Sequence, residues 1–99
     1  MTQVRVAMRD ALNGRVSIRG HAGDERICAA ISTLTGAALN ALGDAAGNVV
    51  YESGRVEFDL NMTDGRQMGA FNTLLTGLEM LSENFSERVG VTVESAASL

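Results

Sequence analysis

The sequence predicts an α+β fold, with two helices packed on one face of a mostly antiparallel sheet in the order β-β-α-β-β-α-β. Three observations predict it. Four short segments alternate apolar and polar residues, as half-buried strands do. Two longer segments carry apolar residues at helical spacing. Each helical segment follows a pair of strand segments, and 99 residues suffice for a single domain, 1–99, with one core.

The first two strand segments predict a hairpin. Residues 3–8 alternate, and residues 15–20 alternate again before the chain reaches His21. Their inward side chains are expected to be Val4, Val6, Met8, Val16 and Ile18. Asn13-Gly14 between the two segments is typical of a tight hairpin turn.

The first helix is expected between Asp24 and Gly43. Its apolar stripe consists of Ile27, Ile31, Leu34, Ala38 and Leu42. Asp24 is a plausible N-cap, because its carboxylate can accept a hydrogen bond from a first-turn amide. Gly43 is a plausible stop, because glycine tolerates the left-handed conformation that follows a helix end.

The middle of the chain predicts a second pair of strands. Residues 43–48, "GDAAGN", are expected to form a loop, and residues 49–51 a short strand. A tight turn at Glu52-Ser53-Gly54 leads into residues 55–62, the clearest alternation in the chain. Its inward side chains are expected to be Val56, Phe58, Leu60 and Met62, with Arg55, Glu57, Asp59 and Asn61 on the other face.

The last part of the chain predicts a helix and a strand. The helix is expected over residues 67–85. Its buried face is expected to be Met68, Phe71, Leu74, Leu75, Leu78, Leu81 and Phe85. Val89, Val91 and Val93 alternate as a final strand, and "ESAASL" is expected to be a frayed tail.

Composition argues against several classes of protein. The eight basic residues are all arginine and are scattered through a chain of net charge −4, so no nucleic-acid footprint is expected. No apolar run approaches the ~20 residues of a membrane span, so no membrane contact is expected. One cysteine and one histidine are too few for a disulfide or a zinc site, so we expect no metal or cofactor. A reducing, cytoplasmic compartment is the simplest expectation.

The stretch "GHAGDERICAA" holds the only histidine, His21, and the only cysteine, Cys28. If Asp24 caps the helix, Cys28 lies in the first turn, where unpaired amides and the helix dipole favour a thiolate. The same amides could donate to an oxyanion. His21 at a strand end could pair with the sulfur and protonate a leaving amine. The residues alone leave two other interpretations open, a buried cysteine and a surface or capping histidine.

Neighbouring residues could support such a dyad. Asp24 or Glu25 could orient His21, although acidic residues in a first turn are also explained by capping and the helix dipole. Ala29 and Ala30 are small and would leave space for a substrate backbone.

"GHAG" followed by "ICAAIS" strongly resembles the ribosomal-processing cysteine protease family of bacteria, called Prp. The matching residues are Gly20, His21, Ala22, Gly23, Cys28, Ala29, Ala30, Ile31 and Ser32. Residues 74–93 look like the family's second helix and final strand. The segment between the dyad residues, 22–27, is shorter than the glycine-rich loop that family members usually carry there.

The resemblance implies a cysteine endopeptidase with His21 and Cys28 as its dyad. Family members form homodimers and remove a short N-terminal extension from the large-subunit ribosomal protein numbered twenty-seven, whereas phage-encoded relatives are thought to process phage structural proteins. Gly20, Ala22, Gly23 and Ser32 become candidates for binding or orienting the substrate, and helix packing is the alternative role for Ser32. A non-catalytic peptide-binding or assembly module and a purely structural small dimer are the competing hypotheses.

Overall fold

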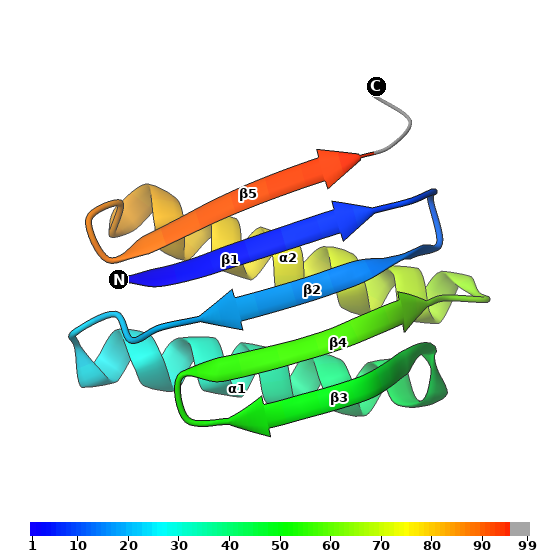
Figure 1. Ribbon diagram of the computed structural model, residues 1–99, viewed down its shortest axis with the longest axis horizontal. Coiled ribbons are helices and arrows are strands. Elements are labelled where there is room, and N and C mark those ends of the chain that lie inside the picture. Colours follow the sequence, from blue (N-terminus) through cyan, green and yellow to red (C-terminus); the bar gives the residue numbers. More distant parts are fainter. Residues whose placement is uncertain (96–99) are drawn as a thin grey trace.

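The computed structural model describes residues 1–95 and confirms the predicted fold class and element order (Figure 1). The elements are β1 (Thr2–Met8), β2 (Asn13–Arg19), α1 (Glu25–Leu42), a 3-10 turn (Gly43–Ala45), β3 (Ala46–Glu52), β4 (Arg55–Asn61), α2 (Gly65–Asn84) and β5 (Val89–Ser95). The predicted tail was to begin at Glu94, but Glu94 and Ser95 still belong to β5, and residues 96–99 lie outside the described residues.

The five strands form one mixed sheet in the order β3-β4-β2-β1-β5. Within residues 1–95, only β1 and β5 pair in parallel, and the other three neighbouring pairs are antiparallel. Both helices lie behind the same face of the sheet, with α1 behind the β4 and β3 side and α2 behind the β1 and β5 side (Figure 1). The helices therefore cover one face only, and the core lies between them and the sheet.

Alternation identified the core side chains of the central strands correctly. The predicted inward residues that are buried are Val4, Val6, Val16, Ile18, Val56, Phe58, Leu60 and Met62. Met8 at the end of β1 is only half-buried. A period of two is enough here, because one face of each strand meets the helices and the other does not.

The predicted turn at Asn13-Gly14 is wrong. The loop is residues 9–12, and Gly14 already pairs with Met8 in the β1–β2 ladder. The Asp10 carboxylate shapes the loop by accepting hydrogen bonds from the amides of Leu12 at 2.8 Å and Asn13 at 2.9 Å. These bonds give the backbone amides of the turn a local acceptor. The bond from the Leu12 amide is also the main cause that lowers the pKa of Asp10.

Both predicted ends of α1 are confirmed. The Asp24 side chain accepts from the amides of Arg26 at 2.9 Å and Ile27 at 3.4 Å, and Gly43 ends the helix with a φ of 55°. The buried face is Ile27, Ile31, Thr35, Ala38 and Leu42, so Thr35 takes the place that the sequence analysis gave to Leu34. Thr35 is tolerated in the core because its hydroxyl donates to the Ile31 carbonyl at 2.7 Å.

The expectation that no apolar run approaches the length of a membrane span is wrong for the segment Glu25–Ala45. By length and composition alone it is long and apolar enough to cross a membrane, with a mean hydropathy of 1.2 in its most apolar window. A helix in the core of a globular protein passes the same test. In this fold one side of α1 packs against the sheet and α2.

The predicted loop over residues 43–48 is also wrong. The helix is followed by the 3-10 turn, and β3 begins at Ala46. A register shift between Gly47 and Val50, together with the left-handed conformation of Asn48 at a φ of 49°, marks a bulge in this edge strand. β3 and β4 are joined by Ser53-Gly54, as predicted, and Gly54 has the positive φ of 75° that this turn requires.

The second helix begins earlier than expected, at Gly65 with Asp64 as its cap. Met68 and Phe85 were predicted to be buried but are 36% and 44% exposed. They lie near the two ends of α2, whereas Phe71, Leu74 and Leu78 in its middle contact the core. Val93 is half-exposed, because α2 runs diagonally away from the later half of β5 (Figure 1).

Candidate active site

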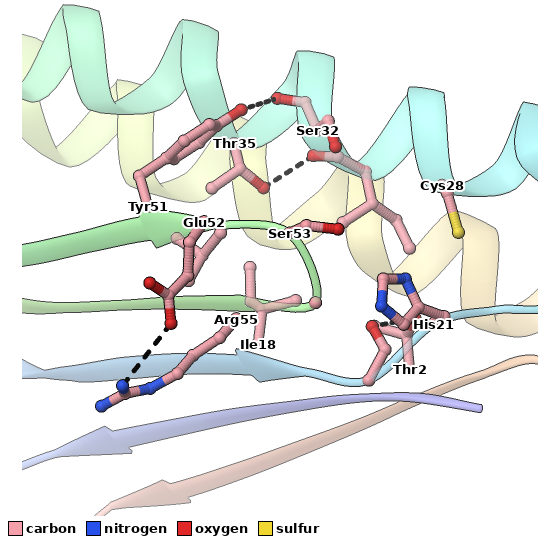
Figure 2. A pocket seen from close by; sticks show the side chains of 14 residues that line it. Thr2, Ile18, His21, Cys28, Ser32, Thr35, Tyr51, Glu52, Ser53 and Arg55 are labelled. Atoms are coloured by element: carbon pink, nitrogen blue, oxygen red, sulfur yellow. Dashed lines mark hydrogen bonds and ion pairs between the residues drawn. The ribbon is translucent and has the colours of Figure 1, made fainter.

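A pocket of ≈ 440 Å³ lies where β2 ends, α1 begins and the β3–β4 turn approaches (Figure 2). It is lined by Thr2, Ile18, Gly20, His21, Cys28, Ile31, Ser32, Thr35, Tyr51, Glu52, Ser53, Gly54, Arg55 and Val56. Its volume falls within the ~300–1,000 Å³ that is common for ligand sites. The chain's only histidine and only cysteine therefore line the same pocket.

The backbone on either side of His21 is held by three hydrogen bonds. The Gly20 amide donates to the Gly54 carbonyl at 2.9 Å, and the Gly20 carbonyl accepts from the Thr2 hydroxyl at 3.4 Å. On the other side, Nη1 of Arg88 donates to the Ala22 carbonyl at 3.0 Å. Three distant segments thus fix the residues that flank His21, although none of these hydrogen bonds involves the imidazole ring.

Gly54 leaves the space that the imidazole occupies. A Cβ on Gly54 would lie 2.7 Å from Nε2 of His21, which is closer than real Cβ contacts allow. Glycine is therefore favoured at position 54 for two reasons: its φ is positive, and a side chain there would collide with the imidazole ring. The β3–β4 turn consequently sets where His21 can lie.

Cys28 lies in the first turn of α1 and is half-buried. Figure 2 shows its sulfur directed from the helix toward the His21 ring. Within residues 1–95, neither side chain makes a hydrogen bond to another protein group. The short connection through Gly23 brings a strand end and a helix start together, as the sequence analysis expected.

Contrary to the expectation, the amides of Arg26, Ile27 and Cys28 at the start of α1 are already hydrogen-bonded and are not free to bind an oxyanion. The amides of Arg26 and Ile27 donate to the Asp24 side chain, and the Cys28 amide donates to the Asp24 carbonyl at 3.0 Å. In a capped helix, the first amides donate hydrogen bonds to the cap residue, so a bound oxyanion would have to compete with that residue for them.

Asp24 serves as a cap in this structure. Hydrogen bonds from the Arg26 amide and then from the Arg26 side chain are the main causes that lower the pKa of Asp24. The carboxylate therefore stays charged at the helix start, where the dipole favours it. Glu25 is exposed and lies outside the pocket lining. Neither acidic residue is placed to orient His21.

The other predicted site residues divide into two groups. Gly20 and Ser32 line the pocket with the two candidate dyad residues. Ala22 is buried at 3% exposure, and Gly23 and Ala29 are exposed outside the lining.

Sequence reasoning missed the wall that the β3–β4 hairpin and the start of β1 contribute. Thr2, Tyr51 and Ser53 line the pocket but lie far from His21 along the chain. The only signal was the predicted turn at 52–54, which by itself points to no site.

Charged side chains also cluster on the sheet face opposite the two helices, and Arg55, which lines the pocket together with Glu52, belongs to this cluster as well. Glu57 is buried at 4% exposure and accepts hydrogen bonds from Arg55 at 2.7 Å and Arg19 at 2.9 Å. These bonds lower its pKa to about 2. Among residues 1–95, no group of three or more His, Cys, Asp or Glu side chains could hold a metal ion.

A family model described as cysteine protease Prp matches residues 1–90. No curated protein matches the sequence.

Solved structures share the fold. The ribosomal processing protease Prp of Staphylococcus aureus, crystallised with a covalently linked product peptide, aligns with a TM-score of 0.80 and 19% identity over 95% of this chain and 100% of that chain. The SMU.848 protein of Streptococcus mutans aligns with a TM-score of 0.79 and 26% identity over 96% of this chain and 95% of that chain. A second structure of the S. aureus protease, with a substrate peptide, aligns at 17% identity and a TM-score of 0.79, covering 95% of this chain and 100% of that chain.

Proposed function

We propose, from the premise that this chain belongs to the Prp family of cysteine proteases, that Cys28 is the nucleophile and His21 the general acid and base of its peptide cleavage. One observation carries this proposal. The only cysteine and the only histidine are 7 residues apart in sequence, and they line one pocket, with His21 in the loop after β2 and Cys28 in the first turn of α1. Any cysteine protease chemistry in this chain must use Cys28, because no other thiol exists.

The first half of the reaction forms an acyl-enzyme. The Cys28 thiolate attacks the carbonyl carbon of the scissile peptide bond, so a C–S bond forms and the carbonyl π electrons move to oxygen. As the carbonyl reforms, the C–N bond breaks and protonated His21 gives its proton to the leaving nitrogen. The C-terminal fragment departs as an amine, and His21 is left neutral.

The second half releases the other fragment. Neutral His21 takes a proton from water while the water oxygen adds to the acyl carbon. The C–S bond then breaks, and its electron pair returns to sulfur as thiolate. The N-terminal fragment leaves as a carboxylic acid, and the enzyme regains a thiolate beside a protonated imidazole.

The substrate class that we propose is an extended segment of a protein, the N-terminal extension of the large-subunit ribosomal protein numbered twenty-seven. A related protease of known structure is described as ribosomal processing and was crystallised with a substrate peptide. We include in the proposal a homodimer, which the family resemblance implies. We also include a reducing cytosol, because the thiol must stay unoxidised to act.

The test uses the full chain and peptides that span such an extension, with fragments identified by mass. The parent protein should release two fragments at one bond, and Cys28→Ala should release neither while its thermal melting stays unchanged. If Cys28→Ala cleaves as fast as the parent, the nucleophile assignment is wrong. If neither protein cleaves any of the peptides, the proposed substrate is wrong.

Thiol reactivity separates a protease from a non-catalytic binding module. Iodoacetamide should modify Cys28 faster at neutral pH than it modifies a free cysteine peptide, since the thiolate is the reactive form. A rate no faster than that of the peptide would favour the binding module.

A further inference from the structure

We propose that Tyr51 closes the pocket at the end away from Cys28 and His21 and thereby limits the length of the apolar substrate side chain that the pocket accepts. The inference rests on the proposed function of this site. It deepens that function by assigning a specificity-determining residue on β3, an element with no part in the motif that identified the dyad.

The floor of the pocket is apolar. Ile18, Ile31 and Val56 line it and are 4%, 6% and 9% exposed. Thr35 is fully buried, and its hydroxyl is engaged by the Ile31 carbonyl, so it adds no free polar group. A side chain that enters beside the dyad would therefore be bound by burial of apolar surface.

Tyr51 crosses from the edge strand to α1. Its hydroxyl donates to the Ser32 carbonyl at 2.9 Å, and Ser32 lies one turn after Cys28. Figure 2 shows the ring at the opposite end of the pocket from His21, with the hydroxyl held against the helix. Tyr51 is 50% exposed, and this hydrogen bond fixes its hydroxyl end against the helix.

A glycine in the middle of α1 makes room for this contact. Gly36 lies one turn after Ser32, and a Cβ there would lie 3.3 Å from the Tyr51 hydroxyl. Glycine is unfavourable in a helix interior, so its presence where the hydroxyl reaches the helix supports a specific role for the contact. The closed end of the pocket therefore depends on a contact between β3 and α1, two elements that the fold brings together.

The consequence concerns side-chain length. A long side chain entering from the dyad end would meet the Tyr51 ring, whereas a short one would stop before it. Removal of the ring opens this end toward Glu52 and solvent, and removal of the hydroxyl alone lets the ring swing away. Discrimination between apolar side chains by one group of a pocket wall is typically about tenfold or more.

The experiment compares Tyr51→Ala and Tyr51→Phe with the parent. A proteome-derived peptide library read by mass spectrometry first locates the bonds cleaved by the parent. Peptides are then made in which each residue flanking the scissile bond is varied through Ala, Val, Leu, Phe and naphthylalanine, and kcat/KM is measured. Val49→Ala is the control, since Val49 is an exposed apolar residue of the same strand outside the pocket lining.

At one flanking position, Tyr51→Ala should raise the naphthylalanine-to-valine ratio of kcat/KM about tenfold. Tyr51→Phe should give a smaller change in the same direction, and Val49→Ala none. Unchanged ratios in Tyr51→Ala overturn the inference while leaving the protease assignment intact. If Tyr51→Ala does not fold, unchanged ratios in Tyr51→Phe overturn it. If the parent cleaves no more of the library than Cys28→Ala, the proposed function fails and this inference fails with it.

Discussion

The bare face of the sheet and the two candidate catalytic side chains of the pocket differ in how their polar groups are paired. On the bare face, Glu57 is enclosed by Arg19 and Arg55, and Arg15 pairs with Asp59 at 2.7 Å. In the pocket, His21 and Cys28 have no hydrogen-bonded partner among residues 1–95. Paired charges hold the strands in register, whereas unpaired side chains remain available to a substrate.

The two regions are also rigid for different reasons. Side-chain ion pairs link β2 to β4 across the bare face. A hydrogen bond from the Gly20 amide, together with side-chain hydrogen bonds from Thr2 and Arg88 to backbone carbonyls, holds the chain on either side of His21. Changes at the pocket should therefore affect catalysis far more than stability, and changes on the bare face should do the reverse.

The largest expected effect is that of His21→Ala. Loss of the general acid and base should lower kcat/KM on a cleaved peptide by about 10³-fold, within the range of such catalysis. The melting temperature should change little, because the His21 side chain is exposed. Steady-state kinetics and thermal melting measure the two effects. Full retention of activity would remove His21 from the mechanism.

The next effect tests the contact between Gly54 and the imidazole. Gly54→Ala should lower kcat about 100-fold, because the added Cβ would displace the His21 ring. Gly43→Ala is the matched control, since Gly43 also has a positive φ, 55°, and a Cβ on Gly43 would meet nothing within 4 Å. Equal activity of the two variants would show that the Gly54 turn does not position His21.

A smaller effect is expected from Arg88, which we interpret as a positioning residue. Arg88→Gln should lower kcat about tenfold with little change in KM, because a loosened Ala22 carbonyl would misplace His21 without removing any substrate contact. Arg88→Lys keeps a donor of similar reach and should restore part of the loss. An effect confined to KM, or equal loss in both variants, would contradict this role.

The smallest effect on activity is expected on the bare face, at Glu57. Its pKa of about 2 lies below the ordinary 4.5, so its ion pairs stabilise the fold above about pH 4.5 and that stabilisation is lost as the pH falls toward 2. Glu57→Gln should lower the melting temperature at pH 7 and flatten its dependence on pH between 5 and 2, with peptide cleavage at pH 7 unchanged. Thermal melting across this range is the measurement, and Glu79→Gln on the exposed side of α2 is the control. An unchanged pH dependence would refute the role of the cluster.

Local patterns predicted the elements well where one interaction dominates. The cap at Asp24 and the stop at Gly43 were correct, because each depends on groups within one turn. The turn predicted at Asn13-Gly14 was wrong, because hydrogen bonds to the Asp10 carboxylate stabilise a turn over residues 9–12 instead. The loop expected at 43–48 proved to include a bulged strand, since pairing with β4 outweighed the weak strand propensity of "AGN".

The candidate site was predicted only in part. Cys28 and His21 were chosen because they are chemically distinctive and close in sequence. Tyr51 and Gly54 were missed as site residues, because their roles depend on contacts with Ser32 and His21, 19 and 33 positions away in the chain. Glu57 was expected on the solvent face and is buried there by arginines from β2 and β4.

By itself, the sequence determined the order of the elements, the inward face of each central strand, the two ends of α1 and the pair of side chains able to do chemistry. These depend on periodicity, capping and residue type, which act over one turn or one strand. Only the tertiary structure decided which hairpin walls the pocket and which carboxylate is buried among arginines. The physical reason is that a pocket is the space left between packed elements, and its shape depends on contacts between residues that the chain order keeps apart.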